Sequence, residues 1–135
     1  VVYPAEFQKI PLHSLEVVRT LSKTFSLAIV TSRRRIGVES YFAVAPLQSH
    51  FSTIVAVEDV SKKKPHPEPL LTAARRLGLT SKETVYIGDS AVDVEAAKAA
   101  GMRVIVCTEI PGADAYFSSF QELPGLIARM SRPSR

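Results

Sequence analysis

Apolar positions along the chain follow two alternating patterns. The first consists of short continuous apolar runs with many branched residues, which are typical of strands buried on both faces of a sheet. These runs cover residues 25–30, 53–57, 84–87 and 103–107, and a short strand is expected near 115–117. The second pattern places apolar residues three or four positions apart, which predicts helices. The predicted helices cover residues 14–23, 34–42, 67–77, 90–100 and 121–130.

Capping residues support several of these helices. Ser14 and Ser90 stand where a side chain can cap a helix N-terminus. Gly78 and Gly101 follow the last apolar positions of two helices, where glycine readily ends a helix. In the helix over 67–77 the predicted buried stripe consists of Leu70, Leu71, Ala74 and Leu77.

Strands that alternate with helices predict an α/β fold. Such an order implies right-handed crossovers and a parallel sheet covered by helices on both sides, a three-layer Rossmann-like arrangement. Ligands of these sheets bind at the carboxyl ends of the strands. The residues directly after each strand are therefore the candidates for chemistry.

Composition indicates one soluble domain. The chain has 135 residues, of which 46% are hydrophobic and 22% charged. Its longest apolar runs are too short to span a bilayer, and residues 1–10 do not resemble a signal peptide. The single cysteine, Cys107, lies in an apolar run and is expected to be buried. A disulfide framework is excluded, and a cytoplasmic location is expected.

The basic residues predict solvated loops rather than a nucleic-acid interface. The formal net charge is +4, and the positive residues cluster at 33–35, 62–64 and 129–135. Aromatic residues make up only 7% of the chain and do not interleave with these clusters. No nucleic-acid or membrane partner is expected, and residues 131–135 are expected to be disordered.

Polar residues follow the predicted strands in an order that suggests phosphate chemistry. Thr31 and Ser32 end the first strand and offer hydroxyl and N–H groups to phosphate oxygens. Lys64, after the second strand, supplies a positive charge. Asp89 and Asp93 follow the third strand and offer the hard oxygen ligands that Mg²⁺ takes.

Each of these residues has a simpler interpretation when taken alone. Thr31 can be an ordinary strand-end hydroxyl, and Lys64 can be a solvated lysine beside Lys62 and Lys63. Ser90 and Asp93 can be no more than a helix cap. The order, the spacing and the strand context together favour a common site, in which Gly88 is expected to allow a tight turn.

Three segments resemble motifs of the haloacid dehalogenase superfamily of phosphohydrolases. Residues 27–32, Leu-Ala-Ile-Val-Thr-Ser, are similar to its second motif, and Lys64-Pro65 is similar to its third. Residues 88–93, Gly-Asp-Ser-Ala-Val-Asp, are similar to the fourth and are the most specific match. The resemblance covers about residues 11–126 and is greatest to the phosphoglycolate phosphatase and β-phosphoglucomutase-like branch.

The resemblance implies a Mg²⁺-dependent phosphatase that acts on a small phosphorylated metabolite. It gives catalytic roles to Thr31, Lys64 and Asp89, and phosphate-binding roles to Thr31, Ser32 and Lys64. It places Mg²⁺ on Asp89 with help from Asp93. Substitution of Asp89 by Asn or of Lys64 by Ala is expected to abolish activity in a protein that contains all the motifs.

The first motif of the family is absent, because no Asp-x-Asp occurs in the chain. The nucleophilic aspartate is therefore expected outside this chain, in a preceding segment that would also supply the central strand. Residues 1–10 are interpreted as the remnant of a cap or linker, and residues 11–130 as the core. The central gap in the sheet is expected to be filled by direct strand pairing, by a homo-oligomeric partner or by a second chain.

Other classes of protein remain open at this stage. The main alternative is an inactive relative that serves as a binding or interaction module. A signalling receiver domain also has a parallel sheet, acidic residues and a lysine, but it uses them almost in the reverse order.

Overall fold

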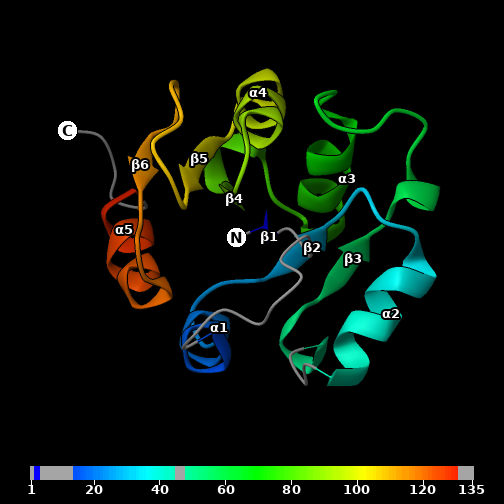
Figure 1. Cartoon of the computed structure of the whole chain (residues 1–135), viewed down its shortest axis with the longest axis horizontal. Coiled ribbons are helices and arrows are strands. Elements are labelled where there is room, and N and C mark those ends of the chain that lie inside the picture. The colour runs from blue at the N-terminus through cyan, green and yellow to red at the C-terminus, as the bar shows by residue number, and fades with distance from the viewer. Residues whose placement is uncertain (1, 4–13, 45–47, 131–135) are drawn as a thin grey trace.

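The computed structural model describes residues 2–3, 14–44 and 48–130. Its centre is a six-stranded sheet of order β3-β2-β1-β4-β5-β6, in which all neighbouring strands are parallel (Figure 1). The strands are β1 (Val2–Tyr3), β2 (Ala28–Val30), β3 (Thr53–Val55), β4 (Val85–Gly88), β5 (Arg103–Val106) and β6 (Ala115–Tyr116). The predicted α/β class and parallel sheet are confirmed.

Within the described residues, five α-helices connect and cover the strands (Figure 1). They are α1 (Ser14–Ser22), α2 (Arg35–Val44), α3 (Glu68–Leu77), α4 (Ala91–Ala100) and α5 (Leu123–Met130). A short 3-10 turn, η2 (Val57–Asp59), follows β3. None of the helices in the described ranges is long and apolar enough to cross a membrane.

The centre of the sheet differs from the prediction. Strand β1 lies between β2 and β4, with Val2 paired to both Ala28 and Tyr86. The predicted gap is therefore absent, and Val2 and Tyr3 belong to the sheet rather than to a cap remnant. The physical reason is that two inner edges would leave rows of unpaired N–H and C=O groups. Residues 1, 4–13 and 131–135, including the tail predicted to be disordered, lie outside the described residues.

Alternating strand residues point to two separate cores. Ile29, Ile87 and Ile105 pack with α1 and α5 on one face of the sheet. On the other face, their strand neighbours pack against α3 and α4. The side chains of this second core include Ala28, Val30, Val55, Tyr86, Val104 and Val106. The sheet is therefore covered on both faces, as continuous apolar strands require.

Helix α3 buries a different stripe from the predicted one, and Leu77 is only partly buried. Leu70, Ala73 and Ala74 are buried, whereas Leu71 keeps 39% of its surface exposed. The inclusion of Leu71 in the stripe was wrong, because it lies one position, about 100° of helical rotation, away from Leu70. Gly78 ends the helix as predicted, in a left-handed conformation with φ of 72°.

Candidate active site

The parallel order of the strands brings the predicted residues to one edge of the sheet. Thr31 directly follows β2 and Asp89 directly follows β4, and only β1 lies between these two strands. With a spacing of about 4.8 Å between neighbouring strands, the two positions are roughly 10 Å apart across the sheet. A phosphate group with its ligands is of a size to bridge that distance.

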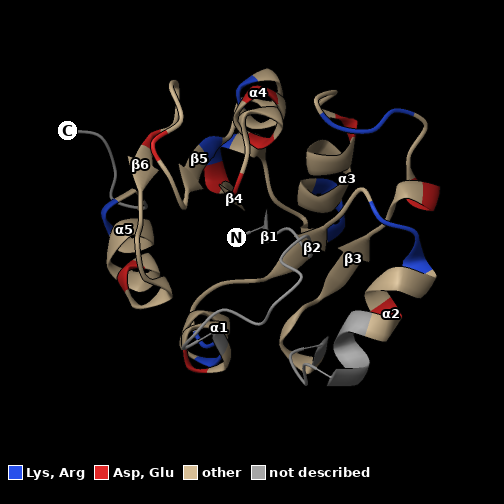
Figure 2. Ribbon diagram, in the orientation of Figure 1, with Lys and Arg blue, Asp and Glu red and all other residues tan. Residues whose placement is uncertain are grey.

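Lys64 is buried, in contrast to the two lysines before it. Its side chain is 2% exposed, whereas Lys62 and Lys63 are exposed, and Figure 2 shows basic residues along this loop before α3. The Lys64 ammonium donates hydrogen bonds to Asp93 Oδ1 at 2.8 Å and to the Tyr86 hydroxyl at 3.0 Å. The Lys64–Pro65 peptide bond is cis. Its burial and these hydrogen bonds show that Lys64 is not an ordinary solvated lysine.

Asp93 holds the other members of this cluster together. Its fully buried carboxylate accepts hydrogen bonds at Oδ1 from Lys64 and from the Tyr86 hydroxyl, the latter at 3.0 Å. At Oδ2 it accepts from the Asp89 N–H at 2.9 Å and from Ser90 Oγ at 3.3 Å. Burial alone would raise its pKa, but the charge and the hydrogen bond of Lys64 and the hydrogen bond from the Asp89 N–H lower the pKa below its usual value.

Gly88 has a different role from the predicted one. It does not adopt a positive φ, so the backbone itself does not require glycine there. A Cβ at this position would lie 2.5 Å from the Cβ of Asp93 and 2.8 Å from its Oδ2. Glycine is required because the Asp93 side chain passes directly over the end of β4.

The loop after β2 is ordered by hydrogen bonds of its own. The Thr31 N–H donates to Val55 O at 3.0 Å, and the Thr31 hydroxyl accepts from the Arg33 N–H at 3.0 Å. The Thr31 side chain is buried, whereas Ser32 is exposed, with no hydrogen-bond partner for its N–H in the described part of the chain. The backbone of Ser32 is therefore available to an anion at this edge of the sheet.

Tyr86 is a member of the cluster for which the sequence predicted no role. It is fully buried on β4, and its ring centroid is 5.7 Å from the Lys64 ammonium. The signal was present in the sequence, because a tyrosine in an aliphatic strand must find a partner for its hydroxyl. The hydroxyl donates to Asp93 in the first turn of α4 and accepts from Lys64, 22 residues away, and the local pattern cannot identify these partners.

The carboxylates at this edge offer the hard oxygen ligands that Mg²⁺ prefers. Within the described residues there is no group of three or more His, Cys, Asp or Glu side chains placed to hold a metal. Mg²⁺ commonly uses only one or two carboxylates, with water and phosphate oxygens completing its octahedron. The pair Asp89 and Asp93 fits such a site, although four hydrogen bonds already occupy the oxygens of Asp93.

Cys107 borders the same edge. It is a free thiol and only partly buried, so the prediction of a buried thiol was only partly right. Burial raises the pKa of the Cys107 thiol, and the negative charge of Asp89 raises it further. The protonated thiol is a poor metal ligand and a poor nucleophile at neutral pH.

Known proteins are similar to this chain in sequence and in fold. Residues 6–107 match the family model of haloacid dehalogenase-like hydrolases. A phosphoglycolate phosphatase from Salmonella typhi is 43% identical over 76 residues, which cover 56% of this chain and 30% of that protein. The chain thus spans about a third of the length of the curated relatives that it matches.

Solved structures agree with this relationship. A haloacid dehalogenase-superfamily hydrolase from Geobacter sulfurreducens superposes with a TM-score of 0.81 and 29% identity, covering 87% of this chain and 60% of that one. CbbY from Rhodobacter sphaeroides, solved in complex with phosphate, gives 0.73 and 30%, covering 80% and 53%. The chain therefore belongs to the haloacid dehalogenase-like hydrolases, in the branch of the phosphoglycolate phosphatases and β-phosphoglucomutases.

Proposed function

We propose that this chain supplies the phosphate-binding and metal-binding part of a phosphatase that hydrolyses small phosphomonoesters with Mg²⁺. The observation that supports this most directly is the buried contact between Lys64 and Asp93, 29 residues apart in sequence. A buried ammonium and a buried carboxylate are costly to desolvate, and such pairs are typical of functional sites. This pair lies beside Asp89, at the edge of the sheet where ligands of α/β proteins bind.

Each residue then has a defined role. The Thr31 hydroxyl and the Ser32 N–H donate hydrogen bonds to the phosphate oxygens, and Lys64 stabilises their negative charge. Asp89 would hold Mg²⁺ with help from Asp93, whose Oδ2 accepts the Asp89 N–H and so positions Asp89. When bound, the metal screens the charge on the phosphate.

The nucleophile is proposed to be an aspartate outside this chain. No Asp-x-Asp occurs among the 135 residues, and the family resemblance places that motif before the matched region. Attack of this aspartate on phosphorus would form an aspartyl-phosphate and release the alcohol, and water would then hydrolyse the acyl phosphate. The residues of this chain position the phosphate and stabilise its charge during both steps.

Hydrolysis of p-nitrophenyl phosphate tests this proposal. The protein would be assayed as this chain alone and as a longer form that includes the preceding coding region. We expect turnover only in the longer form, with loss of activity on chelation by EDTA. The Asp89→Asn variant of the longer form should lose at least about 10²-fold in kcat. Near-normal turnover by that variant would refute the assignment of Asp89.

A second function is favoured by the missing Asp-x-Asp. The chain would then be an inactive relative that binds a phosphorylated ligand without hydrolysing it. Phosphate binding without turnover in the longer form would support this alternative.

A further inference from the structure

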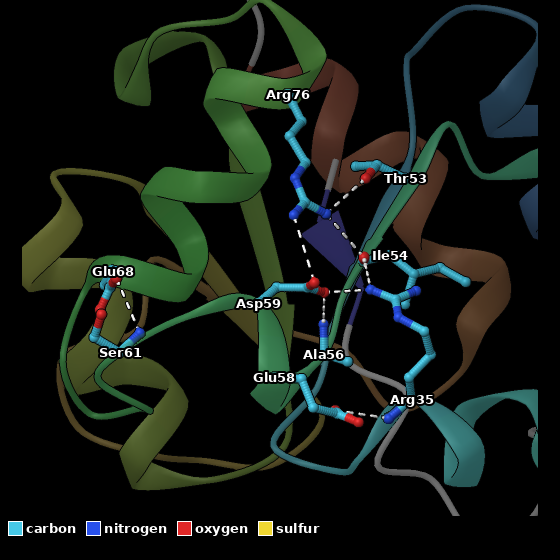
Figure 3. Close-up of polar contacts among 9 residues, drawn as sticks. All are labelled: Arg35, Thr53, Ile54, Ala56, Glu58, Asp59, Ser61, Glu68 and Arg76. Atoms are coloured by element: carbon cyan, nitrogen blue, oxygen red, sulfur yellow. Dashed lines mark hydrogen bonds and ion pairs between the residues drawn. The ribbon is translucent and has the colours of Figure 1, made fainter.

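Two acidic residues in η2, the turn that follows edge strand β3, hold the start of helix α2 (Figure 3). The backbone N–H of Arg35, the first residue of α2, donates to Glu58 Oε1 at 2.8 Å. The Arg35 guanidinium forms an ion pair with Asp59 and also donates to Ile54 O at 3.3 Å. Backbone and side chain of one residue are thus both tied to the turn after β3.

Asp59 is itself fixed in place. Its Oδ2 accepts a hydrogen bond from the Ala56 N–H at 2.8 Å, and its side chain is only 20% exposed. Arg76 of α3 approaches Asp59 Oδ1 at 3.7 Å and donates to Ile54 O at 3.1 Å (Figure 3). Contacts other than the one with Arg35 therefore fix the position of the Asp59 carboxylate, which makes it a rigid anchor for the start of α2.

The anchored helix start lies only four residues after Thr31. Between them, Arg33 donates its N–H to the Thr31 hydroxyl and accepts a hydrogen bond at its carbonyl from the Val57 N–H at 3.1 Å. The loop over 31–34 is thus held at both ends, by β3 on one side and by the η2 turn on the other. A loop fixed in this way keeps its hydrogen-bond donors pointed in one direction.

We propose that Arg35 and Asp59 form a positioning pair that fixes the 31–34 loop, and with it the hydroxyl of Thr31 and the N–H of Ser32. For its effect on phosphate this inference rests on the proposed function. Neither residue would touch the substrate. Their ion pair would keep the loop in its binding geometry, so that phosphate binding does not have to order the loop.

Arg76 provides the matched control. Both arginines contact Asp59 and donate to the same carbonyl of β3, but only Arg35 belongs to the segment that follows the loop. If the network only stabilises the edge strand, Arg35→Gln and Arg76→Gln should have the same consequences. If Arg35 positions the loop, the two variants should differ.

Two measurements on Arg35→Gln, Asp59→Asn and Arg76→Gln test the proposal. The first is the rate of amide hydrogen exchange of residues 32–34 by NMR, together with the melting temperature. We expect exchange in this loop to accelerate about fivefold in Arg35→Gln and Asp59→Asn, which is the size of effect expected for the loss of a partly exposed ion pair. In Arg76→Gln we expect an acceleration of less than about twofold. Equal loop exchange in all three variants would overturn the inference, whatever their melting temperatures.

The second measurement is the dissociation constant of inorganic phosphate in the presence of MgCl₂, by isothermal titration calorimetry. It should rise about fivefold in Arg35→Gln and Asp59→Asn and stay within twofold in Arg76→Gln. Loosened loops with unchanged phosphate affinity would also contradict the positioning role. An absence of phosphate binding in the unmodified chain would instead overturn the proposed function, and loop exchange would still decide whether the pair fixes the loop.

Discussion

At the scale of single residues, the site depends on a close approach that the sequence only partly reveals. The spacing of Gly88, Asp89 and Asp93 predicted that they act together, and the structure brings all three into contact. The reason why position 88 requires glycine was not predictable. It is the close approach of the Asp93 side chain, and not the backbone conformation of Gly88, that excludes a larger residue. Likewise, burial separates Lys64 from its two lysine neighbours, which the sequence cannot distinguish.

Gly88→Ala should therefore destabilise the protein. The new Cβ would meet Asp93 at 2.5 Å, closer than non-bonded carbons approach, and either β4 or the start of α4 must move. We expect a loss of about 1–3 kcal/mol or more in the free energy of unfolding, measured by urea denaturation. Gly125→Ala is the control, because nothing lies within 4 Å of the added Cβ in α5. A Gly88→Ala variant as stable as wild type would contradict this packing.

The lowered pKa of Asp93 predicts acid sensitivity. A carboxyl group whose pKa is lower in the folded than in the unfolded state stabilises the fold above its unfolded pKa of about 4. That stabilisation is lost as the pH falls through the folded pKa. The free energy of unfolding should thus fall between pH 5 and pH 3, with part of the fall caused by Asp93.

Asp93→Asn isolates this contribution. The variant leaves Lys64 buried without its counter-charge and should lose about 3–5 kcal/mol at pH 7. It should then lose less stability than wild type on acidification to pH 3. Parallel pH profiles for the two proteins would contradict the assignment, and a ¹³C NMR titration of the Asp93 carboxyl in the wild-type chain gives an independent measurement.

At the scale of elements, periodicity predicted most helices and strands within a few residues. The apolar run over 103–107 became β5 (Arg103–Val106), and the stripe over 90–100 became α4 (Ala91–Ala100). Errors arose at the ends: the run over 25–30 forms a strand only from Ala28, because Phe25 and Leu27 pack into the core before pairing begins. Apolar patterns report burial, whereas strand bounds depend on the partner strand.

Gly78 tests how helix α3 ends. With φ of 72° and no atom within 4 Å of an added Cβ, its need for glycine is purely conformational. Gly78→Ala should cost about 1–2 kcal/mol, whereas Gly78→Asn should cost less, since asparagine tolerates the left-handed region. Thermal unfolding followed by circular dichroism gives both values. Equal stability of the alanine variant and wild type would show that the helix ends differently.

At the scale of the whole molecule, the sequence predicted the layers of the fold but not the centre of the sheet. A strand of two residues, Val2–Tyr3, shows no periodic pattern, and its partners lie 26 and 84 positions away from Val2, as the pairings Val2 with Ala28 and Val2 with Tyr86 show. The convergence of strand ends was predictable, because it follows from parallel topology alone. The Arg35–Asp59 pair was not predictable, because it depends on how the chain runs from β2 into α2.

The central claim is that Thr31, Lys64 and Asp89 surround one phosphate at the carboxyl edge of the sheet. Calorimetric titration of inorganic phosphate with MgCl₂ into the intact chain, Thr31→Val and Asp89→Asn tests it most directly. We predict one saturable site in the intact chain and at least about tenfold weaker binding in each variant. Thr31→Val loses one hydrogen bond to a charged group, and Asp89→Asn loses the proposed carboxylate ligand of Mg²⁺. Equal affinity in all three proteins, or no saturable binding by the intact chain, would contradict the account.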